Sequence, residues 1–460
     1  GPDELCRRSS ADIRRTLAAM GISVDGFGPY DDEYRATVLH FFRALHVAGR
    51  LRLRTVQLPY LERTGEFLVE GLVEGDCPVC LAQSRGGICE TCGHPNDNGE
   101  LGAPHSTVDP ADTPTMREAS ILVLPLEEYR AELTAYHEAR AARWRPSIVQ
   151  LVREALARPL PDFPVTYPLR WGIPAPFPET PGQVLNAWAE TMPAAMFTTA
   201  YCARRRGPWA DPPGELWRSA HDVRLVHFLG FDNAYFWALP YVALLLAHDG
   251  RYIVPDTIVP NEFYELEHEK LSTSRGHVLW CHDLLREVSR DVARFYLALT
   301  APEHQRTSFS RSGLEKTAGR RLVGPWNRLA GVLAASATAL GYDEGLPVSA
   351  AGRARAAVML QRFDACYEFP GFSLHRAADL VLVQLDRLVR STAHLKSGAA
   401  DARSCALGDL LLETRALLAA AAPILIDVAE TARRAGAGDL ALTRQLHDVA
   451  EVRPFVLPAL

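Results

Sequence analysis

The hydrophobic residues in the first 75 positions alternate between helical and strand-like spacing. The pattern predicts helices over residues 5–21 and 32–48, each ended by a glycine. Short apolar runs over 52–59 and 66–73 then favour strands. The second helix has a broad apolar stripe made of Val38, Leu39, Phe41, Phe42, Leu45 and Val47.

Farther along, the pattern changes from mixed to almost purely helical. Helices are expected near residues 126–143 and 148–157, after a polar, irregular stretch over 96–113. A single helix is expected over 283–300, and alanine- and leucine-rich helices over most of 312–460. The fold class is therefore α/β in the first part and α in the second.

Four of the nine cysteines have a metal-binding spacing, Cys77-x2-Cys80-x8-Cys89-x2-Cys92. Each Cys-x-x-Cys turn brings two thiolates to one ion, and four thiolates complete the tetrahedral shell that structural zinc prefers. Zn²⁺ is therefore expected as a structural ion that holds a small domain together. The alternative is four free buried cysteines. The other five cysteines show no paired framework, which favours a reducing cytoplasm.

The overall charge argues against some partners. A net charge of −6 gives no general attraction for DNA, and local arginine patches at 204–206 and 320–321 are more often solvated surface. No apolar run of 18 residues predicts a membrane span.

Two short segments suggest a nucleotide. Lys270 is followed by Ser272, Ser274 and Arg275, and such a cationic, hydroxyl-rich loop suits a triphosphate. Upstream, the strand-like run 227–233 ends in Gly230-Phe231-Asp232, where an α/β sheet presents a carboxylate to a ribose. The alternatives are a solvated basic loop and a helix N-cap at Asp232.

Taken in this order, the cysteine knuckle, the Gly-x-Asp strand end and the Lys-x-Ser-x-Ser loop resemble the class I aminoacyl-tRNA synthetases, most closely the methionyl-tRNA synthetase family. The resemblance covers about residues 10–450. It implies a partial Rossmann-type catalytic core with an inserted zinc-knuckle connective domain and a C-terminal α-helical bundle. The implied divisions are 1–50, helical part of the core; 51–162, connective domain; 163–282, second half of the core; 283–320, a linker like the stem-contact region; and 321–460, a bundle like the anticodon-binding domain.

The resemblance also implies site residues. Catalytic residues would be Lys270, Ser272, Thr273 and Ser274, with ATP held by Gly230, Asp232, Lys270 and Arg275. The segment 184–190 is similar to a family strand that lines the amino-acid pocket, whose residues here would be Trp188, Glu190, Tyr235 and Trp237. Trp188 alone also fits a core aromatic.

This chain departs from the family pattern at several of these positions. Glu190 stands in place of an aspartate, Trp237 in place of a histidine, and Thr273 in place of a lysine that helps neutralise pyrophosphate. In the helical part, Gly324 replaces an anticodon-contacting asparagine and Leu395 a stacking tryptophan. These changes indicate an altered substrate and a weakened tRNA reader.

The family's His-x-Gly-His signature is absent from the 460 residues. Either that N-terminal portion lies outside this sequence, or the protein cannot make an adenylate unaided. The leading hypothesis is a cytoplasmic enzyme of specialised metabolism that activates an amino acid with ATP and Mg²⁺ and passes it to a small-molecule acceptor in place of methionine tRNA. A tRNA is the alternative acceptor. A precedent is the synthetase-like half of the bacterial hydrazine synthetases, which accompanies a cupin partner. The alternatives are a genuine methionine tRNA ligase and a non-catalytic binding protein.

Overall fold

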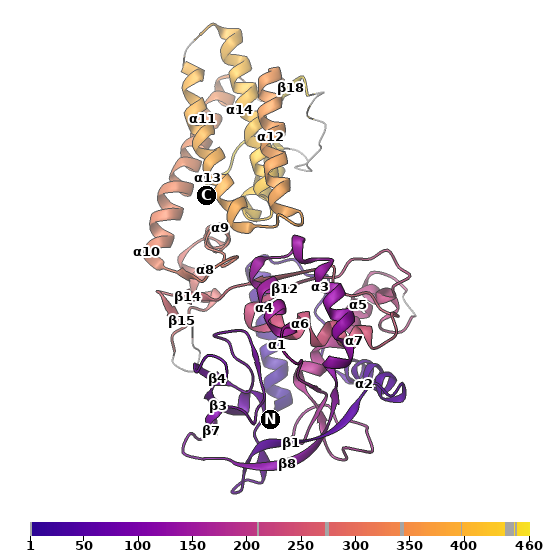
Figure 1. Ribbon diagram of the computed structural model, residues 1–460. Helices are drawn as coiled ribbons and strands as arrows, with labels where there is room; N and C mark the ends of the chain where they lie inside the picture. The colour runs from indigo at the N-terminus through magenta and orange to yellow at the C-terminus, as the bar shows by residue number, and fades with distance from the viewer. Residues whose placement is uncertain are drawn as a thin grey trace. The chain divides into compact units, whose positions relative to one another are not determined.

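The computed structural model describes residues 2–208, 211–271, 276–340, 345–396, 398–437, 446 and 449–460 (Figure 1). The chain forms two compact units. The first comprises residues 1–9 and 24–261, and the second comprises residues 10–23 and 262–460. Each unit is described separately below.

The two expected N-terminal helices are confirmed. They are α1 (Pro2–Ala19) and α2 (Asp32–Val47). Helix α2 begins where the Asp31 carboxylate accepts a hydrogen bond of 2.9 Å from the backbone N–H of Tyr34. Its apolar stripe buries Val38, Phe41, Phe42 and Leu45 in the core of the first unit. Residue spacing therefore fixed both the type and the buried face of this helix.

A long antiparallel pair forms the main sheet of the first unit. Strand β1 (Arg52–Leu61) pairs with β8 (Thr115–Leu124), and the two lie side by side in Figure 1. The short strands β2 (Glu66–Phe67) and β9 (Phe163–Pro164) extend this sheet in the order β2-β1-β8-β9.

The strand expected over 66–73 is wrong in its second half. Strand β2 ends at Phe67, and a one-turn 3₁₀ helix, η1 (Glu70–Leu72), follows. Glu70 has a φ of 53°, a left-handed conformation that no strand accommodates. The chain is thereby redirected into β3 (Val73–Asp76), which belongs to another sheet.

Small sheets surround the cysteine segment. Strand β3 lies between β4 (Gln83–Arg85) and β7 (Gly102–Ser106), while β5 (Gly87–Ile88) pairs with β6 (Pro95–Asn96). The stretch 96–113 is thus less irregular than expected, because β7 completes the sheet there.

Helices pack around a second, parallel strand pair. The expected helices appear as α3 (Arg130–Glu138) and α4 (Pro146–Leu156), each with flanking 3₁₀ turns or loops. Strand β12 (Val226–Gly230) runs parallel to β13 (Thr257–Asn261) and leads through the 3₁₀ turn η5 (Phe231–Asn233) into α6 (Ala234–Ala238) and α7 (Pro240–Leu246).

The segment 184–190 is mostly helical, which corrects the expected strand. Strand β11 covers only Val184–Leu185, and α5 (Ala187–Arg206) begins directly afterwards. The reason is local: the Asn186 side chain accepts a hydrogen bond of 3.0 Å from the backbone N–H of Trp188 and so caps the helix.

The second unit begins with a three-stranded sheet. It contains β14 (Tyr264–Leu266), β15 (Glu269–Lys270) and β16 (Thr307–Phe309). The single helix expected over 283–300 is two helices, α8 (Cys281–Glu287) and α9 (Arg290–Leu299). Val288 is extended, and Ser289 caps α9 by accepting from the backbone N–H of Val292.

The remaining chain is helical, as expected. Helices α11 to α14 lie side by side in Figure 1 around a core that contains the fully buried indole of Trp326. Among the residues that the structure describes, no helix has both the length and the apolar character that crossing a bilayer requires. The helices of this part are α10 (Arg311–Leu314), the π-helical η6 (Glu315–Val323), α11 (Gly324–Leu340), α12 (Ala350–Tyr367), α13 (Leu374–Ser391), the 3₁₀ helix η7 (Thr392–Lys396), α14 (Ala400–Ala421) and α15 (Ile426–Ala432); β17 (Leu346–Pro347) pairs with β18 (Glu451–Val452).

One buried histidine in the first unit links the fold to pH. His137 of α3 is 6% exposed, and its Nε2 donates a hydrogen bond of 2.9 Å to the carbonyl of Ala238 at the end of α6. Burial lowers the pKa of His137 to about 4, well below the ordinary 6.5, because the charged imidazolium would lose its hydration. The native protein therefore keeps this ring neutral at mildly acidic pH.

We expect the free energy of unfolding to fall as the pH drops from about 6.5 towards 4. In that window the unfolded chain binds a proton at His137 and the native chain does not, so stability present above pH 6.5 is lost. For His137→Gln, the loss between pH 7 and 4.5 should be smaller by about 2–3 kcal/mol than in the unmodified protein. Urea unfolding at both pH values measures this. The exposed His40, replaced in the same way, is the control, and an equal pH response in both variants would contradict the prediction.

Candidate functional site

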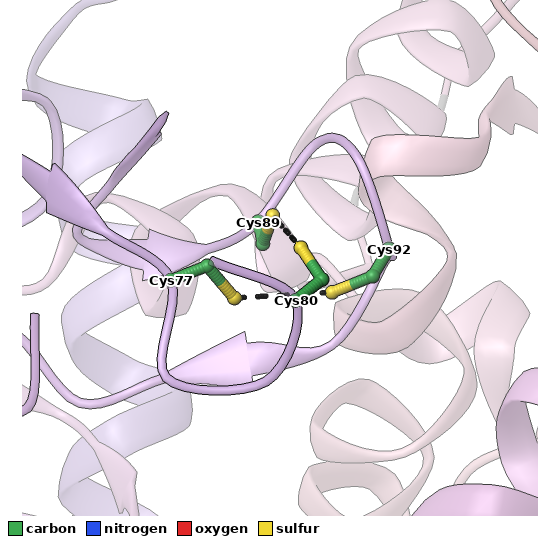
Figure 2. A group of neighbouring side chains, drawn as sticks. All are labelled: Cys77, Cys80, Cys89 and Cys92. Atoms are coloured by element: carbon green, nitrogen blue, oxygen red, sulfur yellow. Dashed lines mark hydrogen bonds between the residues drawn. The ribbon is translucent and has the colours of Figure 1, made fainter. Parts of the chain in front are cut away.

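The four predicted cysteine ligands lie together (Figure 2). Cys77 Sγ is 3.9 Å from Cys92 Sγ, Cys80 Sγ is 3.7 Å from Cys89 Sγ, and all four sulfurs lie within 4.8 Å of one another. The two Cys-x-x-Cys turns are built alike. The backbone N–H four residues after the first cysteine donates to its carbonyl, at 2.9 Å in one turn and 2.8 Å in the other.

This donor set fits zinc. Four thiolates about 2.3 Å from a tetrahedral ion are about 3.8 Å apart, close to the two shorter sulfur separations here. Burial opposes ionisation of Cys89, but hydrogen bonds from the backbone of Cys92 and Thr91 outweigh it and lower its pKa to about 7, whereas burial raises the pKa of the Cys77 and Cys92 thiols. A thiol that ionises near neutral pH is suited to a metal ligand.

The turn that leaves the cysteine cluster packs on the predicted nucleotide segment. Gly93 has a φ of +74°, and a Cβ there would lie 2.7 Å from the Phe231 ring. The next residue, His94, has its Nε2 3.2 Å from a carboxylate oxygen of Glu154 in α4. A glycine is needed at 93 both for the backbone conformation and for the close approach of Phe231.

Gly230 and Asp232 form a tight corner at the end of β12. A Cβ on Gly230 would lie 2.5 Å from Asp232 Oδ1, so only glycine leaves room for the carboxylate to fold back over the strand end. Asn233 Nδ2 donates a hydrogen bond of 2.9 Å to the same oxygen. Asp232 lies inside η5, and its side chain caps no helix. The alternative of a helix N-cap at Asp232 is therefore wrong.

The two tryptophans among the predicted pocket residues pack against other aromatic rings of the first unit. Trp188, in the first turn of α5, stacks on Phe236 of α6 with ring centroids 4.1 Å apart and an interplanar angle of 21°. Trp237 instead contacts His227, at 4.6 Å between centroids, and Tyr241, at 4.7 Å. The two tryptophans therefore belong to different aromatic groups.

The Glu190 side chain belongs to neither of these aromatic groups. Its carboxylate accepts a hydrogen bond of 3.0 Å from the Tyr34 hydroxyl of α2. Burial raises the pKa of Glu190, and hydrogen bonding to Tyr34 works against that rise. Glu190 thus joins α5 to α2.

A cavity of about 620 Å³ lies beside these aromatic residues in the first unit. Tyr235, which is 2% exposed, lines it together with Phe236. Trp188, Glu190 and Trp237 are not among its lining residues. The four predicted pocket residues lie in α5 and α6, and of these four only Tyr235 lines this cavity.

Sequence reasoning missed Glu70, which also lines the cavity. Side-chain hydrogen bonds link it to Trp188 and Tyr167, and its backbone N–H donates 2.7 Å to Asn98 Oδ1. Asn98 Nδ2 in turn donates 3.1 Å to the Tyr167 hydroxyl. The available signal was an acidic residue inside an apolar run, but its partners are far away in the sequence.

The predicted phosphate loop is described only at its beginning. Lys270 is an exposed residue at the end of β15 in the second unit. Ser272, Thr273, Ser274 and Arg275 lie outside the described residues.

The two positions that the resemblance aligns with anticodon contacts lie in the helical part. Gly324 begins α11, and Leu395 packs partly buried against the core of the second unit. Neither position offers a flat aromatic face to a nucleobase.

Comparisons with known proteins agree with this architecture. A family model described as tRNA synthetases class I (M) matches residues 1–331. The methionine–tRNA ligase of Salinibacter ruber is 31% identical over 339 residues, which are 70% of this chain and 46% of that protein. The corresponding ligase of Roseiflexus castenholzii is 31% identical over 338 residues, or 72% and 57% of the two chains. The chain spans about half the length of the curated relatives it matches.

Solved structures show the same fold. Methionyl-tRNA synthetase of Mycobacterium tuberculosis in complex with methionyl-adenylate superposes with a TM-score of 0.75 at 20% identity, covering 99% of this chain and 86% of that one. Its apo form gives a TM-score of 0.72 at 18% identity, with the same coverage. The likeness runs through both compact units, and the chain belongs to the class I (M) family of tRNA synthetases.

Proposed function

We propose that this protein activates an amino acid with ATP, forming an aminoacyl adenylate and pyrophosphate. The family match over residues 1–331 carries the proposal, since it includes both the Gly230–Asp232 corner and the Lys270 segment. In this role the fixed Asp232 carboxylate accepts hydrogen bonds from the ribose hydroxyls of ATP. Lys270, Ser272, Thr273, Ser274 and Arg275 would hold the triphosphate, with Mg²⁺ bound to the phosphates.

The pocket side of the proposal concerns the residues around Trp188. The Trp188–Phe236 stack offers a flat apolar wall, and Tyr235 lies next to Phe236. Trp237 contributes a large ring where a histidine is expected, so the bound amino acid would differ in size or polarity from methionine. Glu190 would act indirectly, because its carboxylate is engaged with Tyr34.

We further propose a specialised acceptor in place of methionine tRNA. Gly324 and Leu395 support this, because they remove a polar and a stacking contact from the tRNA-reading helices. The setting would be cytoplasmic, and a cupin partner of the kind found with hydrazine synthetases would fit it. The domain divisions at residues 50, 162, 282 and 320 are part of the same proposal. A methionine–tRNA ligase is the second candidate, favoured by the identity of the relatives.

The cysteine cluster has a supporting role in this scheme. Zn²⁺ bound by Cys77, Cys80, Cys89 and Cys92 would have no open coordination position, so its chemistry is structural. The cluster leads directly into Gly93, which packs on Phe231 beside Asp232. An intact cluster would therefore hold the ATP corner in place.

Amino-acid-dependent exchange of pyrophosphate into ATP, measured on the full gene product with all common amino acids, tests the activation step. We expect exchange with an amino acid other than methionine and no charging of methionine tRNA. Exchange with methionine alone, together with tRNA charging, would establish the ligase instead. Exchange with none of them would contradict activation and favour the non-catalytic binding protein.

We expect Asp232→Asn to slow this exchange by roughly 10- to 100-fold, because the ribose would lose charge-assisted hydrogen bonds. The matched control is Asp222→Asn, at an exposed carboxylate four residues before β12 begins and ten residues before Asp232. Equal exchange rates for the two variants would contradict a role for Asp232 in ATP binding.

Zinc should be present at one ion per chain and should be lost from Cys80→Ser. Because the cluster holds short strands that bury little surface, the variant should unfold at a clearly lower temperature. Colorimetric zinc release and thermal unfolding measure the two effects. Cys405→Ser, outside the cluster, should leave both unchanged, and a zinc-free native protein of normal stability would refute the metal site.

A further inference from the structure

The 620 Å³ cavity of the first unit is lined by a carboxylate, Glu70, and by an amide oxygen without a hydrogen-bond partner, Asn96 Oδ1. Strands β1 and β8 form one side, and the segments 94–100 and 158–164 form others. Tyr235 and Phe236 of α6 close it on the catalytic-core side. Its volume lies in the range that proteins use for small molecules and is too small for a macromolecule.

Glu70 is a half-buried carboxylate in the wall of this cavity. Burial raises the pKa of its carboxyl from 4.5 to about 7, although hydrogen bonds to Trp188 and Tyr167 favour the ionised form. Gly87 leaves space for the carboxylate, since a Cβ there would lie 2.1 Å from Glu70 Oε2. Among the described residues, no lysine, arginine or histidine forms an ion pair with Glu70.

Asn96 adds a second acceptor. It is 7% exposed and lines the cavity. Its Nδ2 donates to Ser84 Oγ at 3.1 Å and to the Arg85 carbonyl at 3.2 Å, which fixes the orientation of the amide. The opposite atom, Oδ1, is buried and has no hydrogen-bond partner in the described structure. A buried acceptor left unpaired costs free energy unless a ligand supplies a donor.

The other charges lie nearer to solvent. Arg54 is paired with Asp162, with 2.8 Å between Nε and Oδ2. Asp97 is exposed, and its Oδ1 accepts from the backbone N–H of Gly99. Arg158 is exposed as well. These groups are hydrated, so they compensate the interior carboxylate only weakly.

We propose that this cavity binds a small organic cation, a primary amine or guanidine, whose charged group pairs with Glu70 and donates a hydrogen bond to Asn96 Oδ1. An ammonium or guanidinium group offers only donors, which complements the Glu70 carboxylate and the unpaired Asn96 Oδ1. Phe236 and Tyr235 contact the carbon chain of such a ligand. The site is a binding site, and it stands whether or not the protein activates amino acids.

Isothermal titration at pH 8, where the Glu70 carboxyl is mostly ionised, tests the proposal on the unmodified protein. The probes are 1,5-diaminopentane, L-lysine and agmatine. The neutral counterparts of the first two are 1,5-pentanediol and L-norleucine, which keep the carbon chain and lack the charge. We expect at least one cation to bind roughly 10-fold or more tightly than its neutral counterpart. No cation binding more tightly than its counterpart would overturn the proposal, without any variant being needed.

Two substitutions of equal size locate the charge. Glu70→Gln keeps the shape of the buried side chain and should weaken binding of the cation by roughly 10-fold or more. Asp97→Asn removes an exposed carboxylate from the same cavity and should change binding by less than about 3-fold. Circular dichroism establishes that both variants are folded. Unchanged binding in a folded Glu70→Gln protein would contradict the pairing, as would an equal loss in both variants.

The pyrophosphate exchange assay separates this proposal from the proposed function. If the protein binds the amine but shows no exchange, the binding site stands and the proposed activation is wrong. If the protein catalyses exchange but binds no amine, the proposed activation stands and the binding site is wrong.

Discussion

Much of the first unit depends on four thiol groups that meet at one point. The strands near the cysteine turns are only two to five residues long, and few apolar side chains are buried among them. Such a segment cannot hold its shape by burial alone, so the cysteine cluster has to define it. Residues 93 to 98, which follow the cluster, then take fixed positions against the rest of the unit.

The contact between Gly93 and Phe231 links the cysteine segment to the catalytic core. Phe231 stands between Gly230 and Asp232, so one ring both supports the cysteine turn and separates the two residues of the proposed ATP corner. An apolar ring at this position makes a packing contact, which suits a rigid corner.

Local signals in the sequence were sufficient for some of these features and not for others. The spacing of the cysteines predicted a cluster that the structure brings together, and apolar periodicity predicted α2 and the helical second unit. Periodicity failed where a single residue redirects the chain: Glu70 interrupts a strand with a positive φ, and Ser289 divides α8 from α9. The strand that the family resemblance implied over 184–190 failed for a similar reason, because Asn186 starts a helix there by capping it. Glu70 also escaped notice as a cavity residue because Tyr167 and Trp188 are about a hundred positions away. No local sequence pattern predicts a contact between residues so far apart in the chain.

Asn186 joins the proposed amino-acid pocket of the first unit to its proposed amine site. Its Oδ1 accepts from the backbone of Trp188, its Nδ2 donates 2.9 Å to the carbonyl of Pro164, and it lines the cavity beside Tyr235. One amide therefore sets the start of the helix that bears the aromatic wall and one side of the acceptor-lined cavity. During evolution, a mutation that reshaped either region would also disturb the other. Preferences for two different molecules would then change together, and a laboratory redesign of one would have to begin with residues that do not touch Asn186.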